Sequence, residues 1–255
     1  MALITLNFYS EALGIQTEVM VILPQKSSAG EIGIASKHQD TAYKCLYLLH
    51  GLSDDQTIWM RRTSIERYAA EYGICVVMPC GGRSFYSDTK YGPAYYTYIA
   101  KELPRRIQEF FRVSDKREDT YIAGLSMGGY GAMKIALREP EHYCACAALS
   151  PVCDLDTAGD AGLSNLPQIL FGQDKTPDND SVLFLADKQK NNPDKPRIFM
   201  AIGTEDFLYD NAQPLRQKLT KNGYDFTYQE ESGNHNWGFW DAKIQDALKW
   251  MFDAR

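Results

Sequence analysis

Apolar residues follow two kinds of spacing along this chain. Short segments with strand-like spacing alternate with longer segments in which the spacing is that of a helix. Short apolar runs predict strands, and residues 3–9 and 16–23 are expected to pair as an opening antiparallel unit. Further strands are predicted at 44–50, 74–78, 121–123, 143–150, 197–203 and 225–230. Helices are predicted at 63–73, 95–112 and 130–139, between the last two strands, and after residue 237. This alternation predicts a mostly parallel, doubly wound α/β sheet.

Two local signals refine the predicted helices. Thr63 and Glu66 have the spacing of a capping box, which would begin the helix that ends near Gly73. Pro104 lies inside the helix predicted at 95–112, where its missing N–H group predicts a kink.

The segment 152–196 is the one long stretch with no clear period. It contains Asp, Asn, Gly and Pro throughout, with one apolar island at 166–171. Because loops of this length are usually functional, we expect a small cap-like insertion within a single domain that spans 1–255. A solvated excursion is the alternative.

The sequence Gly124-Leu125-Ser126-Met127-Gly128 lies between a predicted strand and a predicted helix. A serine in that position occupies a sharp turn with its hydroxyl exposed, and the flanking glycines remove Cβ atoms that would collide there. The following helix directs its N-terminus and the backbone N–H of Met127 toward whatever Ser126 attacks. A glycine-rich turn with an incidental serine is the alternative.

A serine nucleophile needs a base, and the chain has four histidines. His38 lies in a polar segment, His50 ends an apolar run and is expected to shape a strand-end loop, and His142 is expected at the surface. His235 lies on a glycine-flanked loop after the last predicted strand and before the terminal helix. We therefore expect His235 to be the base.

The acid that orients the base is expected on the loop after the strand at 197–203. Two carboxylates follow that strand, Glu205 and Asp206, and side-chain direction gives Asp206 only a modest advantage. The chain order is then Ser126, Asp206, His235, which is the order used by α/β hydrolases.

Several motifs together resemble the esterase D-like branch of the α/β hydrolases, with the tributyrin-type acetyl esterases as the closest likeness. The branch also includes feruloyl and acetylxylan esterases and S-formylglutathione hydrolases. The matching stretches run from about residue 45 to 241; they are His50-Gly51-Leu52, Phe85-Tyr86-Ser87-Asp88, Glu102-Leu103-Pro104, Gly124–Gly129, Gly203–Leu208 and Gly233–Trp237. The resemblance favours Asp206 over Glu205 as the acid.

The resemblance implies a serine carboxylesterase acting on short acyl chains, from acetyl to butyryl, with the N–H groups of Leu52 and Met127 as the oxyanion hole. S-formylglutathione hydrolases usually carry Ser-Gly-Leu-Thr-Cys at the oxyanion loop, whereas this chain has His50-Gly51-Leu52-Ser53-Asp54, which counts against a glutathione thioester. Feruloyl or acetylxylan esterase and acyltransferase activities stay open as alternatives, and a non-catalytic binding protein is disfavoured because all three triad positions are filled.

Three aromatic residues near the expected loops are candidates for lining the acyl or alcohol pocket. They are Trp59, Tyr86 and Trp237, and packing in the core is the equal alternative for each. The expected substrate is a small-molecule ester, and no metal or organic cofactor is implied.

Composition limits the partners that the chain can be expected to have. Its 255 residues suit one α/β domain, and 27 basic against 33 acidic side chains give a net charge of −6, which argues against nucleic-acid and anionic-membrane binding. No run approaches the roughly 18 apolar residues of a spanning helix. Relatives in this branch often assemble, so a homo-oligomer is compatible with the resemblance.

The N-terminus and the cysteines bear on the cellular compartment. Residues 1–7 lack a basic start and are too short for the apolar core of a signal peptide, which predicts a cytoplasmic protein, although a chain trimmed of its signal would look the same. The six cysteines mostly lie in apolar, strand-like contexts and are expected to be buried free thiols, with no metal or redox motif; they are Cys45, Cys75, Cys80, Cys144, Cys146 and Cys153.

Overall fold

The computed structural model describes the chain except for residues 26–31, 33–36, 38–40 and 254–255. His38 and most of the loop that includes Gly30 and Gly33 lie outside the described residues. Within the described part of the chain, no helix has the length and apolar character needed to span a membrane.

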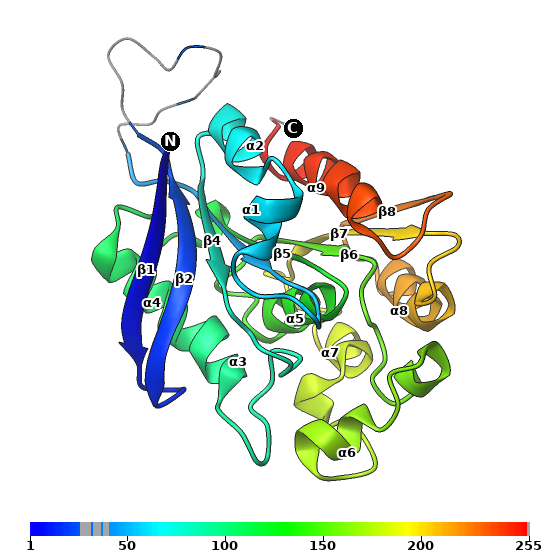
Figure 1. Ribbon diagram of the computed structural model, residues 1–255. Coiled ribbons are helices and arrows are strands. Elements are labelled where there is room, and N and C mark those ends of the chain that lie inside the picture. Colours follow the sequence, from blue (N-terminus) through cyan, green and yellow to red (C-terminus); the bar gives the residue numbers. More distant parts are fainter. Residues whose placement is uncertain (26–31, 33–36, 38–40, 254–255) are drawn as a thin grey trace.

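Eight strands form one mixed sheet in the order β1-β2-β4-β3-β5-β6-β7-β8. The pairs β1–β2 and β2–β4 are antiparallel, and all other pairs are parallel. The opening antiparallel pair and the mostly parallel sheet are as the sequence predicts. Figure 1 shows the antiparallel pair at one edge of the sheet. The strands are β1 (Ala2–Ser10), β2 (Ile15–Leu23), β3 (Cys45–Leu49), β4 (Cys75–Pro79), β5 (Thr120–Leu125), β6 (Ala145–Leu149), β7 (Arg197–Gly203) and β8 (Phe226–Glu231).

Helices cover both faces of the sheet (Figure 1). Along β3, Cys45, Tyr47 and Leu49 join the core under α4, α5, α7 and α8, whereas Leu46 and Leu48 join the core under α1, α2 and α9. Both faces of the central strands are therefore buried, which accounts for their continuous apolar runs. The helices are α1 (Ile58–Arg62), α2 (Ile65–Tyr72), α3 (Tyr95–Thr97), α4 (Leu103–Phe110), α5 (Met127–Arg138), α6 (Leu166–Phe171), α7 (Val182–Lys188), α8 (Tyr209–Lys221) and α9 (Trp237–Phe252).

The helix predicted at 95–112 is interrupted rather than continuous. A π-helical segment, Tyr98–Glu102, separates α3 from α4, and the Leu103 N–H donates to the Tyr98 carbonyl five residues back. Pro104 follows directly, and because proline has no N–H, the α-helical bond to Ala100 cannot form. The disturbance expected at Pro104 therefore takes the form of a widened turn.

The prediction of a capping box at Thr63 and Glu66 is wrong, because the helix begins one residue later than that box requires. The N-cap of α2 is Ser64, and the Thr63 hydroxyl accepts from the Ile65 N–H at 3.1 Å instead of from the residue three positions on. The end of α2 is as predicted, because Gly73 caps it with φ of 65°.

The segment 152–196 is more ordered than its sequence suggests. The apolar island forms α6, and α7, which the sequence reading missed, packs against α5 and α8. Ser181 caps α7 by accepting from the Phe184 N–H at 3.3 Å. A helix of seven residues is too short to give a distinct periodic pattern, so α7 depends on its buried side chains Val182, Leu185 and Ala186.

Candidate active site

The serine turn is built by close contact between backbone segments. Ser126 stands between the end of β5 and the start of α5, with a positive φ of 53° that is rare for a residue with a side chain. A Cβ on Gly124 would lie 2.3 Å from the Gly128 carbonyl oxygen, and one on Gly128 would lie 2.5 Å from the Leu49 carbonyl oxygen. Both glycines are therefore required by the packing, as the sequence reading expects.

Ser126, His235 and Asp206 lie together at the edge where the parallel strands end. The Nε2 atom of His235 is 3.0 Å from the Ser126 hydroxyl oxygen, and Nδ1 is 2.9 Å from Oδ2 of Asp206. Because a carboxylate only accepts, the proton of the neutral ring lies on Nδ1, and the lone pair on Nε2 faces the serine hydroxyl. The arrangement can take a proton from Ser126.

Packing holds the His235 ring in place. The Phe207 ring lies 4.4 Å from it between centroids, and Trp240 meets it edge-on at 4.8 Å. The Trp240 indole N–H donates in turn to the Ser150 hydroxyl at 3.1 Å. The imidazole is thus fixed by two rings in addition to its hydrogen bonds.

Glu205 faces a different group from its neighbour. Its carboxylate accepts from the backbone N–H of Gly233 at 2.5 Å, and this hydrogen bond lowers the pKa of Glu205. The Glu205 carboxylate therefore holds the loop that carries His235. The carboxylate that contacts the imidazole is that of Asp206. The structure separates two carboxylates that residue-level reasoning left nearly equal.

Leu52 and Met127, whose N–H groups are the expected oxyanion donors, line the same cavity as Ser126. Leu52 follows the end of β3, and Met127 is the first residue of α5, whose N–H has no acceptor within the helix. Within the part of the chain that the structure describes, neither N–H has a hydrogen-bond partner, whereas the Ser126 N–H donates to the Leu149 carbonyl at 2.8 Å. Both expected donors are therefore available.

His50 holds the loop that carries Leu52. Its Nε2 accepts from the Gly81 N–H at 2.8 Å, so the ring is neutral with its proton on Nδ1, which donates to the Gly51 carbonyl at 2.7 Å. Burial lowers the pKa of His50, which keeps this form. His50 thus shapes the strand-end loop, as the sequence indicates.

Two of the three aromatic residues expected in the pocket lie beneath it instead. The Tyr86 hydroxyl donates to the His50 carbonyl at 2.9 Å, and the Trp59 indole N–H donates to the Leu49 carbonyl at 3.1 Å. Both side chains are almost completely buried and support the end of β3, so the expectation that they line the cavity is wrong. Trp237 does line the cavity and packs edge-on against Trp59.

The cavity beside Ser126 has a volume of about 450 Å³, within the usual range for small-molecule sites. Sequence reasoning missed much of its wall. Phe207 and Trp240 could have been found from their positions on the acid loop and the first turn of α9, and Ser53, Asp54 and Asn236 adjoin predicted site residues. Other segments supply Arg83, Phe85, Val152 and Leu163. The missed lining residues are Ser53, Asp54, Arg83, Phe85, Val152, Leu163, Phe207, Asn236 and Trp240.

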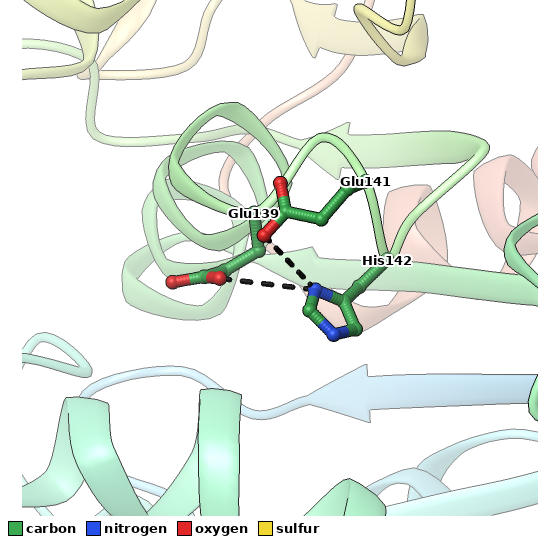
Figure 2. Close-up of side chains that lie close together, drawn as sticks. All are labelled: Glu139, Glu141 and His142. Carbon is green, nitrogen blue, oxygen red and sulfur yellow. Dashed lines mark ion pairs between the residues drawn. The ribbon is translucent and has the colours of Figure 1, made fainter.

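A second cluster of titratable side chains lies at the far end of α5, about 18 Å along the helix axis from Ser126. Figure 2 shows Glu139, Glu141 and His142, with His142 Nδ1 3.2 Å from Glu141 and 3.8 Å from Glu139. The Glu139 carboxylate is already paired with the Lys101 ammonium and the Tyr96 hydroxyl. These contacts of Glu139 account for the position of its carboxylate in the cluster, so the geometry does not require a metal ion.

The cysteines are all free thiols, and burial raises the pKa of Cys146 and Cys153. Cys80 and Cys144 are only partly buried, and the other four are buried as expected. Thiols with a raised pKa are poor nucleophiles, so Cys146 and Cys153 belong to the core.

Comparison with known proteins agrees with this geometry. The model of the family described as "Putative esterase" matches residues 10–251. An acetyl esterase from Caldicellulosiruptor saccharolyticus is 30% identical, with 98% of each chain covered.

Solved structures are similar over the whole chain. The fluorophosphonate-binding serine hydrolase F of Staphylococcus aureus, solved with substrate bound, has 32% identity and a TM-score of 0.86, with 99% of each chain covered. An S-formylglutathione hydrolase from the same organism has 32% identity and a TM-score of 0.82, again over 99% of each chain. A ferulic acid esterase with 22% identity and a TM-score of 0.81 shares the fold.

Proposed function

Because this chain belongs to the esterase family and is a serine esterase with the α/β-hydrolase fold, we propose that it hydrolyses short-chain acyl esters, from acetyl to butyryl. In this proposal Ser126, His235 and Asp206 form the catalytic triad. The observation that carries it is the continuous set of hydrogen bonds from Asp206 through His235 to the Ser126 hydroxyl.

The reaction is a two-step acyl transfer to water. Ser126 Oγ attacks the ester carbonyl carbon while Nε2 of His235 takes its proton, and the same nitrogen then protonates the leaving alcohol. A water molecule, deprotonated by Nε2 of His235, then attacks the acyl carbon. The bond from that carbon to Ser126 Oγ breaks, the acid leaves, and Oγ takes the proton back from His235. Asp206 accepts a hydrogen bond from Nδ1 throughout and stabilises the imidazolium.

The tetrahedral intermediate carries a negative oxygen that needs donors already in position. The N–H groups of Leu52 and Met127 have this role in the proposal, since both residues line the cavity and neither N–H has a hydrogen-bond partner among the described residues. One such donor contributes about 2.7–4 kcal/mol in related sites.

The walls of the cavity favour a short acyl chain. Phe85, Val152 and Leu163 are apolar residues that line it, and Trp237 is the one sequence-expected aromatic residue that contributes. Each methylene that is buried there gains about 0.8 kcal/mol until the chain meets the wall. We therefore expect kcat/KM to rise from acetyl to butyryl and then to fall.

A panel of p-nitrophenyl esters from acetyl to decanoyl tests the chain length. Acetylated sugars and methyl ferulate in the same assay separate a general esterase from acetylxylan and feruloyl esterases, and added alcohol reveals acyl transfer. A maximum of kcat/KM on decanoyl or longer esters would contradict the proposal.

A second candidate substrate is S-formylglutathione, because a structural neighbour of 32% identity is described as an S-formylglutathione hydrolase. The loop His50-Gly51-Leu52-Ser53-Asp54 has His50 in place of the first serine and Asp54 in place of the cysteine of the Ser-Gly-Leu-Thr-Cys pattern usual for that activity. We therefore expect kcat/KM for this thioester to be lower than for p-nitrophenyl acetate, and the reverse order would favour the thioester.

A further inference from the structure

Lys134 places an ammonium group in the protein interior beneath the cavity. It lies on α5, and its side chain is fully buried. Its Nζ atom donates to the Phe85 carbonyl at 3.1 Å, to the Ser87 hydroxyl at 2.5 Å and to Oδ1 of Asp180 at 2.8 Å. All three donors of the ammonium are thereby used.

The first two contacts hold a strained part of the cavity wall. Phe85 lines the cavity, and Phe85 and Tyr86 both have a positive φ, of 50° and 53°. Residues with side chains keep this conformation only when their surroundings impose it. The bond from Lys134 to the Phe85 carbonyl is one such restraint, and the Tyr86 hydroxyl extends it to the His50 carbonyl of the oxyanion loop.

The third contact reaches the insertion at 152–196. Asp180 lies in the short helix Asp178–Asp180 that precedes α7, and its Oδ1 is also 3.0 Å from the Ser87 hydroxyl. The Asp180 carbonyl accepts from the Tyr130 hydroxyl at 2.6 Å, which ties the same turn to α5. The insertion contributes Val152 and Leu163 to the cavity, so its position affects the pocket.

The surroundings of the ammonium are only partly complementary to its charge. Burial lowers the pKa of Lys134 to about 8, and the Asp180 carboxylate opposes that change. The other groups that face this pair are Arg138, 4.0 Å from Asp180, the Asp88 carboxylate, and the rings of Tyr96 and Tyr130. An apolar side chain at position 134 would avoid the cost of removing an ammonium group from water. The pair of Lys134 and Asp180 therefore contributes more to the relative orientation of α5 and the segment 152–196 than to stability.

We propose that Lys134 is a positioning residue for the acyl pocket. Its ammonium joins α5 both to Phe85 and to Asp180 of the segment 152–196. It thereby fixes the distance between the wall that contains Phe85 and the wall that contains Val152 and Leu163, and this distance limits the length of acyl chain that the site accepts. This inference rests on the proposed esterase function.

The test compares Lys134→Met, Asp180→Ala and the double variant with the wild type on acetyl, butyryl and hexanoyl p-nitrophenyl esters. Asp178→Ala is the matched control, because Asp178 lies in the same short turn with an exposed side chain. A fluorophosphonate titration gives the concentration of active sites in each preparation. If Lys134→Met does not fold, Asp180→Ala carries the comparison.

We expect the preference for butyryl over hexanoyl esters, as a ratio of kcat/KM, to fall roughly tenfold in both single variants, which is the usual size for loss of a hydrogen bond to a charged group. The change should lie in KM, the double variant should resemble Lys134→Met, and the control should match the wild type.

An unchanged preference in both single variants, or effects that multiply in the double variant, would overturn the inference while leaving the esterase intact. A uniform loss on all esters, matched by fewer titratable sites, would assign Lys134 a purely structural role. A wild type that hydrolyses none of the esters would overturn the proposed function as well.

Discussion

At the scale of single residues, the direction of a side chain decides its role. Glu205 and Asp206 are neighbours in the sequence, yet one binds the Gly233 N–H and the other the His235 ring. Phe207 and Trp240 then fix the plane of that ring. The site therefore depends on orientation as much as on residue type.

The serine hydroxyl can be removed without disturbing its turn. Ser126→Ala keeps the backbone conformation and should stay folded, but turnover of p-nitrophenyl butyrate should fall by about 10⁴–10⁶, because a triad acts as a unit. Steady-state kinetics and mass spectrometry after fluorophosphonate treatment measure both effects. Labelling of another serine in the wild type would refute the assignment.

The two neighbouring carboxylates should differ sharply when each is made neutral. Asp206→Asn should lower kcat by about 10⁴, since the amide favours the wrong tautomer of His235. Glu205→Gln keeps an oxygen that can accept from Gly233, so its kcat should stay near the wild-type value. If Glu205→Gln proves to be the inactive variant, the acid has been misassigned.

At the scale of elements, the site depends on how closely α5 approaches β3. Gly128 in the first turn of α5 lies against the carbonyl groups of Leu49 and His50. This contact places the Met127 N–H beside the loop that carries Leu52. The position of the proposed oxyanion donor on Met127 therefore depends on how α5 and β3 pack together.

A methyl group at this contact should separate the two elements. In Gly128→Ala the Cβ would lie 2.5 Å from the Leu49 oxygen and 2.6 Å from the His50 oxygen, so α5 must move. We expect a lower unfolding temperature and a kcat reduced by about 10²–10³, as for loss of an oxyanion donor.

The control for this variant is Gly159→Ala, whose new Cβ would meet nothing closer than 3.7 Å. Its unfolding temperature and kcat should match those of the wild type. A Gly128→Ala protein with the kcat of the wild type would contradict the prediction that the position of α5 controls turnover.

At the scale of the whole molecule, six parallel strands, β3 to β8, direct their carboxyl ends to one edge of the sheet. Segments that follow β3, β4, β5, β6, β7 and β8 supply the residues that line the cavity. This follows the general rule that α/β sheets bind ligands at the carboxyl ends of their strands. The buried ion pair between Lys134 and Asp180 joins α5 to the turn Asp178–Asp180 that precedes α7.

The buried ammonium should leave a signature in the pH dependence of stability. The pKa of Lys134 is about 8 in the folded chain, below its ordinary value of 10.5, so the unfolded chain holds more protons between these values. The free energy of unfolding of the wild type should therefore rise relative to Lys134→Met from pH 8 to 10.5, by at most about 3 kcal/mol. Urea denaturation of both proteins at several pH values measures the difference, and parallel curves would contradict a lowered pKa.

The sequence by itself determined the strands, most of the helices and the loops that carry Ser126, Asp206 and His235. These features are local, because burial on both faces of a strand imposes an apolar run and a strand-to-helix turn imposes its glycines. Parallel strands then bring such loops to one edge, so the order along the chain was enough to group them.

Only the tertiary structure decided which side chains meet. It turned Asp206 rather than Glu205 toward His235, buried Trp59 and Tyr86 beneath the cavity, and brought Asp180 to Lys134. The periodicity of a sequence reports which face of an element is buried. It does not report which distant segment covers that face, because long-range packing sets the partner and the direction of each side chain.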